Sequence, residues 1–311
     1  MMLMNTSPAC SVVTDYTRDG WTAADRSRDW CSELESGKIL LFDGVPFDLP
    51  SEDRDFLLSQ KQAASRFHKN ISYRPEKNIL RGIANDSPDR ERMQQVMGRY
   101  SREVVNFVMR FLAPYARDFK LDYASFRPLE EKSRDLVLHK RNDLLHVDAF
   151  PTRPTRGARI LRVFTNINPI VDRVWTTGEP FHVMAPGLAR PAGLPHFANP
   201  SLAQRFVFAT QRAGHVIGLP FPNRSRYDRF MLHFHDWLKE NSNFQQNSPK
   251  VRTDFSPGCS WLVYTDGVPH AVLSGQYVLE QTFIIPQRAL VAPERSPLQV
   301  LETIANTSLA S

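Results

Sequence analysis

Cysteine is scarce in this sequence. Its 311 residues include three cysteines, Cys10, Cys31 and Cys259, and these are widely spaced. So few distant cysteines argue against a disulfide framework and are typical of a protein from a reducing compartment. No pair has the C-x-x-C spacing, so the sequence offers no zinc knuckle.

Long hydrophobic runs are absent as well. No stretch approaches the roughly 18 apolar residues from which a transmembrane helix is built. Residues 1–20 lack both the basic start and the long apolar core of a signal peptide. We therefore expect a soluble, cytoplasmic protein.

Charge is moderate and of mixed sign. The composition is 41% hydrophobic and 23% charged, which is ordinary for a globular protein. A net charge of +6 favours an anionic partner such as nucleic acid, a membrane surface or an acidic substrate. No motif for nucleic-acid binding accompanies it. The alternative is that the charge serves solubility alone.

The N-terminal third of the chain predicts an arm followed by helices. Residues 1–36 carry little periodicity and predict an N-terminal arm, with residues 37–311 forming a single domain. Helical elements are expected over 51–115, and Ser87 with Pro88 marks the start of the clearest one. Its apolar residues recur at helical spacing: Met93, Val96, Met97, Tyr100, Val104, Phe107, Val108 and Phe111.

The rest of the sequence predicts mainly short strands separated by turns. Residues 159–169 are rich in branched side chains, and residues 258–286 alternate three extended runs with two glycine turns. A helical insertion at about 200–245 interrupts the strands and contains an amphipathic helix over 225–242. This pattern predicts a mainly β fold, a barrel with flanking helices.

A candidate metal-binding pair lies in the stretch LLHVDAFPTRP. Side chains two apart on an extended chain point to one side, so His146 and Asp148 can bind one ion. A third ligand should come from a later strand. His270 fits because it opens a strand after the turn YTDGVP, whereas His233 and His235 lie on the amphipathic helix. Three more histidines lie in segments rich in Pro and Gly: His182, His196 and His215. The alternative is that the pair and His270 are polar groups that bind no ion.

The order of H-x-D, a branched strand and the late histidine of DGVPHAV resembles the Fe(II)/2-oxoglutarate-dependent dioxygenases. The resemblance implies a double-stranded β-helix core (jelly-roll, cupin-like) over about 120–286. It also implies Fe(II) held by His146, Asp148 and His270, with 2-oxoglutarate as cosubstrate and O₂ as oxidant. The carboxylate of Asp148 implies hydroxylation, because related halogenases have a small residue at that position.

A closer resemblance is to the Kdo hydroxylases, enzymes that oxidise 3-deoxy-D-manno-octulosonic acid in the lipopolysaccharide inner core. It rests on the segments FRPLEEKSRD, HVDAFPTRPTRGARILRVFTNINP followed by RVW, and DGVPHAVLSGQYVLEQTF. It implies hydroxylation of the 3-position of Kdo in Kdo–lipid A. The enzyme would meet this glycolipid at the cytoplasmic face of the inner membrane, in peripheral contact with its surface. No nucleic-acid partner is expected.

The resemblance also directs attention to the residues that would bind 2-oxoglutarate. Many family members carry a basic residue on the last barrel strand, but this chain offers only glutamines there, Gln276 among them. In the jumonji-type branch the basic residue lies on the strand after H-x-D, which here contains Arg159 and Arg162. We favour Arg162, because strand alternation places the polar Asn166 on its face, and a guanidinium binds a carboxylate in a bidentate manner.

Basic residues cluster in sequence around the H-x-D segment. An anionic substrate with sugar carboxylates and lipid phosphates agrees with their sign, although a solvated basic loop is the alternative. The candidate substrate-binding residues are Arg127, Lys140, Arg141, Arg153 and Arg156.

Other functions share the same three candidate ligands. A jumonji-like protein hydroxylase would have them, and so would a nucleic-acid dealkylase, although dealkylases usually carry arginines after the second histidine and HAVLSGQYVLEQTF has none. A non-catalytic, cupin-like protein would bind metal without consuming 2-oxoglutarate.

Overall fold

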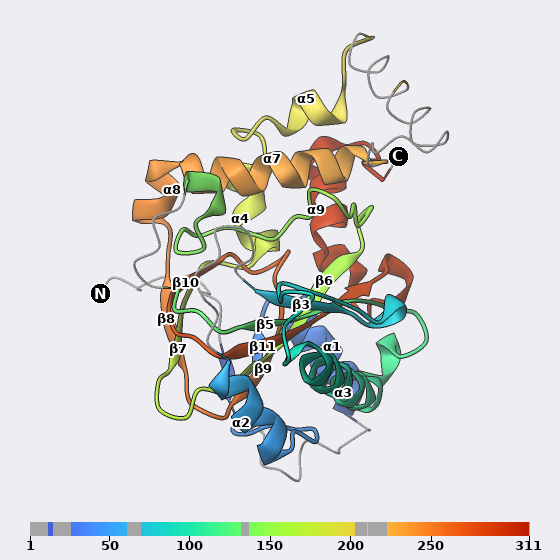
Figure 1. Cartoon of the computed structure of the whole chain (residues 1–311). Coiled ribbons are helices and arrows are strands. Elements are labelled where there is room, and N and C mark those ends of the chain that lie inside the picture. Colours follow the sequence, from blue (N-terminus) through green and yellow to red (C-terminus); the bar gives the residue numbers. More distant parts are fainter. Residues whose placement is uncertain are drawn as a thin grey trace, which may run out of the picture.

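The computed structural model describes residues 12–14, 26–60, 70–131, 137–202, 210 and 223–310. The strands of this part of the chain form two sheets (Figure 1). The larger has eight strands in the order β1 (Val12–Thr14), β2 (Ile39–Phe42), β9 (Ser260–Tyr264), β6 (Arg159–Asn166), β11 (Val278–Ile285), β5 (Lys120–Arg127), β3 (Ile71–Arg74) and β4 (Ile79–Arg81). The smaller has three, in the order β10 (His270–Ser274), β7 (Arg173–Thr177) and β8 (Val251–Phe255).

Aromatic side chains fill the space between the two sheets. Phe164 of β6 and Trp261 of β9 belong to the larger sheet, and both contact Trp175 of β7 in the smaller one. Phe255 of β8 stacks on Trp261 with ring centroids 3.9 Å apart. Every strand pair except β1–β2 is antiparallel. The predicted mainly β fold with flanking helices is confirmed.

Helix α3 (Arg90–Phe111) covers the outer face of the larger sheet. All eight apolar residues predicted for it are buried, and they pack against strand residues such as Leu161 and Val163 of β6. The helix begins two residues after Pro88, because residues 87–89 form a turn before it. Its C-terminal end continues into the short helix η4 (Ala113–Tyr115).

The N-terminal arm was predicted wrongly where the structure describes it. Helix α1 (Ser27–Glu35) is part of the core, with Trp30 4% exposed and stacked on Phe111. The buried carboxylate of Glu35 accepts hydrogen bonds from the hydroxyl of Tyr115 and from the backbone amides of Val291 and Ala292. The nine residues of α1 are too few to show a clear period in sequence. Residues 1–11 and 15–25 of the arm lie outside the described residues.

The region expected to be helical, 51–115, also contains strands. It holds α2 (Ser51–Ser59) and α3 as predicted, but β3 and β4 form a hairpin between them through the short helix η3 (Pro75–Lys77). Each strand of this hairpin has three or four residues, too few for a reliable alternation of polar and apolar side chains.

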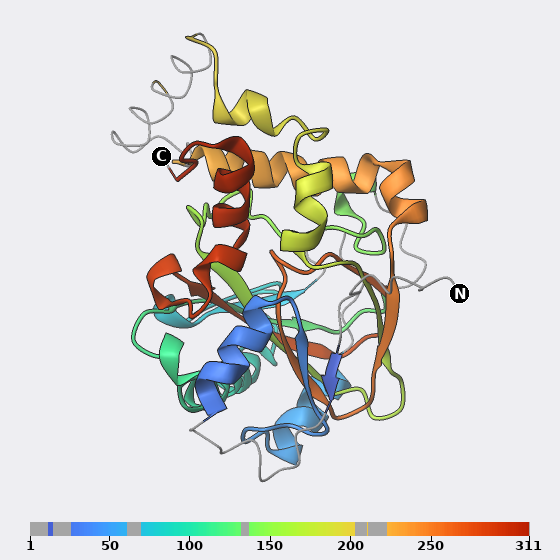
Figure 2. The same ribbon diagram turned by 180° about the vertical axis from the view of Figure 1, so that it is seen from behind.

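A second group of helices covers the opposite side of the molecule, at the top of Figures 1 and 2. The predicted insertion contains α7 (Arg226–Glu240) and α8 (Ser242–Asn247), while most of residues 203–222 lie outside the described part. Three further helices were not anticipated: α4 (Phe181–Leu188), α5 (Leu194–Ala198) and α9 (Pro297–Ala305). The remaining short helices are η5 (Leu138–Lys140), η6 (Gln287–Ala289) and η7 (Pro293–Arg295).

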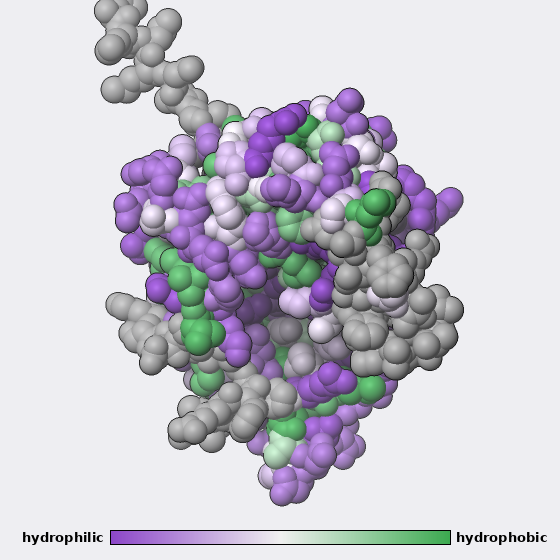
Figure 3. Space-filling view, turned by 90° about the horizontal axis from the view of Figure 1, so that it is seen from above, coloured by the Kyte–Doolittle hydropathy of each residue, from purple (hydrophilic) through white to green (hydrophobic). Residues whose placement is uncertain are grey.

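The helical layer packs directly on the H-x-D segment. Leu145 and Val147 are buried in the same hydrophobic cluster as Phe230 and Phe234 of α7. Helix α7 begins at a capping box in which Ser225 and Asp228 exchange hydrogen bonds. The H-x-D segment therefore lies between this layer and the two sheets. The face of the molecule seen from above is mainly hydrophilic and is hollowed near its centre (Figure 3).

No helix in the described ranges combines the length and hydropathy needed to span a bilayer.

Replacing Trp30 tests whether α1 belongs to the core. We expect Trp30→Ala to reduce the free energy of unfolding by about 3–5 kcal/mol, because it leaves a cavity against Phe111. The exposed Arg28→Ala on the same helix should change it by less than about 0.5 kcal/mol. Urea titration measures both values. Equal stability of the two variants would show that α1 does not pack as described.

Candidate metal centre

The backbone holds His146 and His270 side by side. Their amide and carbonyl groups exchange two hydrogen bonds, at 2.9 and 3.2 Å, in an isolated antiparallel bridge. The amide of Asp148 donates to the carbonyl of Thr265 at 2.8 Å. The H-x-D segment is therefore an extended strip joined at single positions rather than the regular strand that its sequence predicted.

Three side chains converge from these segments. His146, Asp148 and His270 each offer one ligand atom, and these atoms lie within 4.8 Å of one another. The Nε2 atom of His146 is 3.9 Å from Oδ1 of Asp148. Both histidines are buried, 5% and 6% exposed. The sequence prediction that this trio comes together is confirmed in the structure.

Hydrogen bonds orient both imidazoles toward the same point. The Nδ1 atom of His146 is 2.7 Å from the carbonyl of Leu144, and that of His270 is 2.9 Å from the carbonyl of Val268. A carbonyl can only accept, so each Nδ1 carries the proton and each Nε2 keeps a free lone pair. This is the tautomer that binds a metal through Nε2.

Electrostatics keep the three groups in their metal-binding forms. Burial, together with the neighbouring His270, lowers the pKa of His146 well below its ordinary value. Burial also lowers the pKa of His270. For Asp148, burial alone would raise the pKa, but the Arg162 guanidinium and the two histidines outweigh it and hold the pKa below the usual range. Two neutral imidazoles and one carboxylate match the donor set of a mononuclear non-heme iron site.

Two aromatic neighbours of the trio were missed from the sequence. Trp175 of β7 stacks on the ring of His270 with centroids 5.1 Å apart. His235 of α7 packs edge-on against His146 at 4.8 Å, and its Nδ1 is 2.7 Å from the carbonyl of Val147. His233 lies elsewhere, against Phe197. A histidine on an amphipathic helix gives no sign in sequence of which buried ring it will contact.

Arg162 joins the trio to a buried ion-pair network. Its Nη2 lies 2.9 Å from Oδ2 of Asp148, and its Nη1 donates to Oε1 of Glu280 at 2.6 Å. Arg127 donates twice to the other oxygen of Glu280, from Nε at 3.0 Å and from Nη2 at 2.5 Å. Burial alone would raise the pKa of Glu280, but the two guanidinium groups lower it. The network continues from Arg127 to Glu131, whose Oε1 lies 3.9 Å from Nη1 of Arg127 and 3.7 Å from Nη2 of Arg173. Three carboxylates and three guanidinium groups are thus joined.

A cavity of about 350 Å³ opens beside this network. Several of its walls lie in one row across the larger sheet, because Arg81 pairs with Ser72, Ser72 with Ser125, and Ser125 with Glu280 in the strand register. The lining residues are Ser72, Arg81, Tyr123, Ser125, Arg127, Thr152, Arg153, Arg162, Glu280 and Thr282. Its size lies within the range of small-molecule sites, about 300–1,000 Å³.

Of the four residues predicted to bind 2-oxoglutarate, one lines the cavity and three do not. Arg162 lines the cavity, as its predicted facing requires. Arg159 is buried on the other side of β6, where it pairs with Asp266 at 2.9 Å. The amide group of Asn166 is fully used by backbone groups of the loop that follows β6 and by the carbonyl of Phe255. Gln276 lies in the turn between β10 and β11. The structure therefore favours Arg162 alone among the four.

Of the five residues predicted to bind substrate, two line the cavity and three do not. Arg127 and Arg153 line the cavity. Arg141 forms an ion pair with Asp143, and Lys140 is exposed on η5. Arg156 is exposed and adopts a positive φ of 51°. The latter three residues do not line the cavity, whereas Arg81 does and was missed, because its hairpin lies far from the H-x-D segment in sequence.

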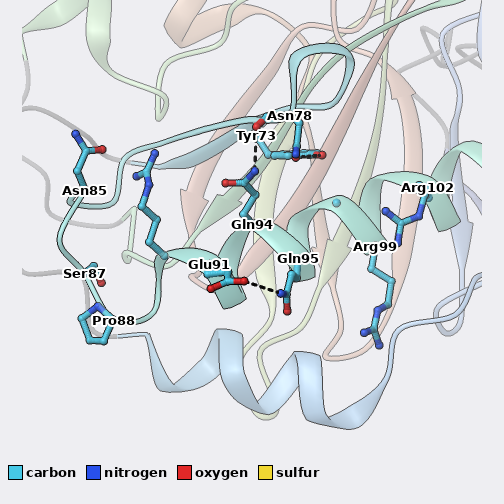
Figure 4. Close-up of a pocket in the computed structure, with 12 residues that line it drawn as sticks. Tyr73, Asn78, Asn85, Ser87, Pro88, Glu91, Gln94, Gln95, Arg99 and Arg102 are labelled. Carbon is cyan, nitrogen blue, oxygen red and sulfur yellow. Dashed lines mark hydrogen bonds between the residues drawn. The ribbon is translucent and has the colours of Figure 1, made fainter.

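A larger cavity, about 780 Å³, lies on the other face of the sheet (Figure 4). It is formed by α3 and the β3–β4 hairpin, with Gln94, Gln95, Arg99 and Arg102 projecting from the helix toward it. None of the candidate metal ligands lines it. We place the active site at the smaller cavity because that one adjoins Arg162 and, through it, Asp148.

Comparison with known proteins identifies close relatives. The family model for 3-deoxy-D-manno-oct-2-ulosonic acid (Kdo) hydroxylase matches residues 18–308. The solved structure of the Kdo hydroxylase KdoO with alphaketoglutarate (2-oxoglutarate) and Fe(III) is 36% identical, with a TM-score of 0.81 over 96% of this chain and 97% of that chain. It is described as a non-heme Fe(II) alphaketoglutarate-dependent dioxygenase.

Two further structures of KdoO have the same identity and TM-score. One contains cobalt(II) and covers 96% of this chain and 97% of that chain. The other is the apo protein and covers 97% of each chain. Among proteins with curated descriptions, none matches this chain.

Substitution of the three ligands should weaken metal binding. His146→Ala, Asp148→Ala and His270→Ala should each reduce Co(II) affinity by more than the roughly 10–100-fold that loss of an outer partner costs. Circular dichroism should stay near that of the wild type. Titration followed by Co(II) absorption measures affinity, with His233→Ala as the matched control. Undiminished affinity in His270→Ala, with loss in His235→Ala, would assign the third ligand to α7.

Proposed function

Since the chain belongs to the Kdo hydroxylase family, we propose that it hydroxylates the 3-position of Kdo in Kdo–lipid A. The protein is an Fe(II)/2-oxoglutarate-dependent dioxygenase with a jelly-roll fold. KdoO has been solved with alphaketoglutarate and with succinate, the cosubstrate and the product of such an enzyme. The observation that carries the proposal for this chain is the buried trio of His146, Asp148 and His270 beside an arginine-lined cavity.

The residues present fit the metal that the family uses. His146 and His270 would hold iron through Nε2, and Asp148 through its carboxylate. Bound iron supplies the oxidative chemistry, in which O₂ and 2-oxoglutarate are consumed and one oxygen atom enters a C–H bond of the substrate. The chain contributes orientation, because the carbonyls of Leu144 and Val268 fix the two rings before any ion arrives.

The surroundings of the trio limit access of water and set the position of the cosubstrate. Trp175 and His235 cover the two imidazole rings. Arg162 is the cavity residue nearest to the trio by contact, since it touches Asp148 directly. We propose that its guanidinium binds a carboxylate of 2-oxoglutarate. Trp175 and His235 thus exclude water, and Arg162 positions the cosubstrate. Exclusion of water and positioning are what the protein contributes to this chemistry.

Charge supports the proposed substrate and location. Kdo–lipid A carries sugar carboxylates and lipid phosphates, and the net charge of +6 together with four arginines in the cavity wall suits an anionic ligand. We propose that the enzyme meets this glycolipid at the cytoplasmic face of the inner membrane, in peripheral contact with the surface. A peptide that carries no anionic group would gain little from these guanidinium groups.

Replacement of Arg162 tests the cosubstrate site. Arg162→Ala should weaken 2-oxoglutarate binding by about 2–5 kcal/mol, or roughly 30-fold or more, because a charge-assisted pair is lost. Arg288→Ala is the control, since Arg288 is 70% exposed and pairs with Asp118 outside the cavity. Equilibrium binding to the Co(II) protein measures affinity. A large loss in Arg159→Ala and none in Arg162→Ala would show that the wrong arginine was chosen.

The reaction itself is tested with purified protein loaded with Fe(II). With Kdo–lipid A and 2-oxoglutarate under ¹⁸O₂, mass spectrometry should find one ¹⁸O atom in the Kdo residue and one succinate for each hydroxylation. Asp148→Ala should give neither product. Coupled turnover with a peptide or methylated DNA, but none with Kdo–lipid A, would contradict the proposed substrate and leave only the oxygenase assignment.

A further inference from the structure

Three arginines lie at the outer end of the cavity, and two of them lie over the ring of Tyr123. Arg153 lies over the ring of Tyr123 at 4.5 Å, and Arg74 lies over the same ring at 5.8 Å. Arg81 lines the cavity from β4, beside Ser72 in the strand register. Because Arg74 is two residues after Ser72 on β3, it projects from the same face of the sheet. We call Arg74, Arg81 and Arg153 the outer arginines.

The charges at the two ends of the cavity differ. At the inner end, Arg127 and Arg162 face the carboxylates of Glu280 and Asp148, so positive and negative charge balance. At the outer end, the structure records an ion pair with Asp122 for Arg153. Neither Arg74 nor Arg81 has a carboxylate partner among the described residues. Within the described part of the chain, three guanidinium groups therefore face one carboxylate, and two positive charges have no carboxylate partner there.

The floor between the two ends is suited to a sugar. Ser72 and Ser125 are direct cross-strand neighbours and both line the cavity, as does Thr282 of β11. Small hydroxyl side chains in a sheet leave room above them and offer both donors and acceptors. A polyhydroxylated ring lying over this strip would have hydrogen-bond partners along its length.

Distance separates the outer arginines from the reacting atom. From Glu280 the row crosses β5 and β3 to reach Arg81 on β4, and three strand spacings amount to about 14 Å. In Kdo the carbon to be oxidised is separated from the carboxylate carbon by a single atom. A sugar placed for reaction near Asp148 therefore keeps its own carboxylate at the inner end, out of reach of Arg81.

We propose that the outer arginines form an anion-binding subsite for a carboxylate or phosphate of the glycolipid other than the carboxylate of the sugar being oxidised. The inference rests on the proposed function. It adds the residues that bind the part of the glycolipid outside the sugar being oxidised. Guanidinium groups bind both carboxylate and phosphate through paired N–H donors. The source of the anion is a second acidic sugar or a phosphate of lipid A.

The test uses the Arg74→Gln, Arg81→Gln double variant of the full chain, loaded with Co(II). Affinity is measured for a glycolipid with two Kdo residues and both lipid phosphates, and separately for 2-oxoglutarate. Arg102→Gln is the matched control, because Arg102 lies on α3 at the cavity of the opposite face (Figure 4). We expect the double variant to bind the glycolipid at least about tenfold more weakly, with 2-oxoglutarate affinity unchanged, and Arg102→Gln to bind both as the wild type does.

Two altered glycolipids identify the source of the anion. If the anion is a second sugar's carboxylate, a glycolipid with one Kdo residue should bind wild type and double variant equally. If the anion is a phosphate, the dephosphorylated glycolipid should bind the wild type and the double variant equally.

Equal affinity of wild type and double variant for the complete glycolipid would overturn the subsite while leaving the proposed function intact. Loss of 2-oxoglutarate affinity in the double variant would overturn it too, because the outer arginines would then serve the cosubstrate. A wild-type protein that neither binds nor oxidises the glycolipid would instead contradict the proposed function, and the subsite with it.

Discussion

The Arg162 guanidinium lies between two carboxylates, and the active site depends on this arrangement. One carboxylate belongs to Asp148, a candidate iron ligand, and the other to Glu280 on the central strand β11. A single side chain thereby connects the metal position to the cavity where cosubstrate and substrate would bind. Removing one member of such a buried network leaves the others unpaired, which typically costs about 3–5 kcal/mol. The network therefore fixes both the geometry of the site and its electrostatic balance.

The layers of the fold bring the network together. The larger sheet supplies Arg162 and Glu280 from neighbouring strands β6 and β11, and the smaller sheet supplies His270 at the start of β10. The helical layer adds His235 and buries Leu145 and Val147 on either side of His146. Irregular backbone at His146 and Asp148 is tolerated because each is joined by hydrogen bonds to another segment. Rigid strands thus support a short extended strip on which two of the three ligands lie.

The parts of the site that depend on a local sequence pattern could be predicted from the sequence. The i, i+2 spacing of His146 and Asp148, the turn before His270 and the alternation along β6 together predicted the trio and the facing of Arg162. Contacts that depend on register between distant strands could not be predicted. Arg81 reaches the cavity through a hairpin that the sequence suggested was helical, and Glu280 looked like an ordinary strand residue. Helix α1 was missed because its burial depends on tertiary partners such as Phe111 and Tyr115, not on its own short pattern.

The central claim is that one metal ion binds between His146, Asp148 and His270 with 2-oxoglutarate held beside it by Arg162. A crystal structure of the Co(II) complex with 2-oxoglutarate, with anomalous data at the cobalt edge, tests this most directly. We predict one anomalous peak within bonding distance of both Nε2 atoms and the Asp148 carboxylate, and a 2-oxoglutarate carboxylate in contact with Arg162. A peak bound by His235 in place of His270, or 2-oxoglutarate located away from Arg162, would contradict it.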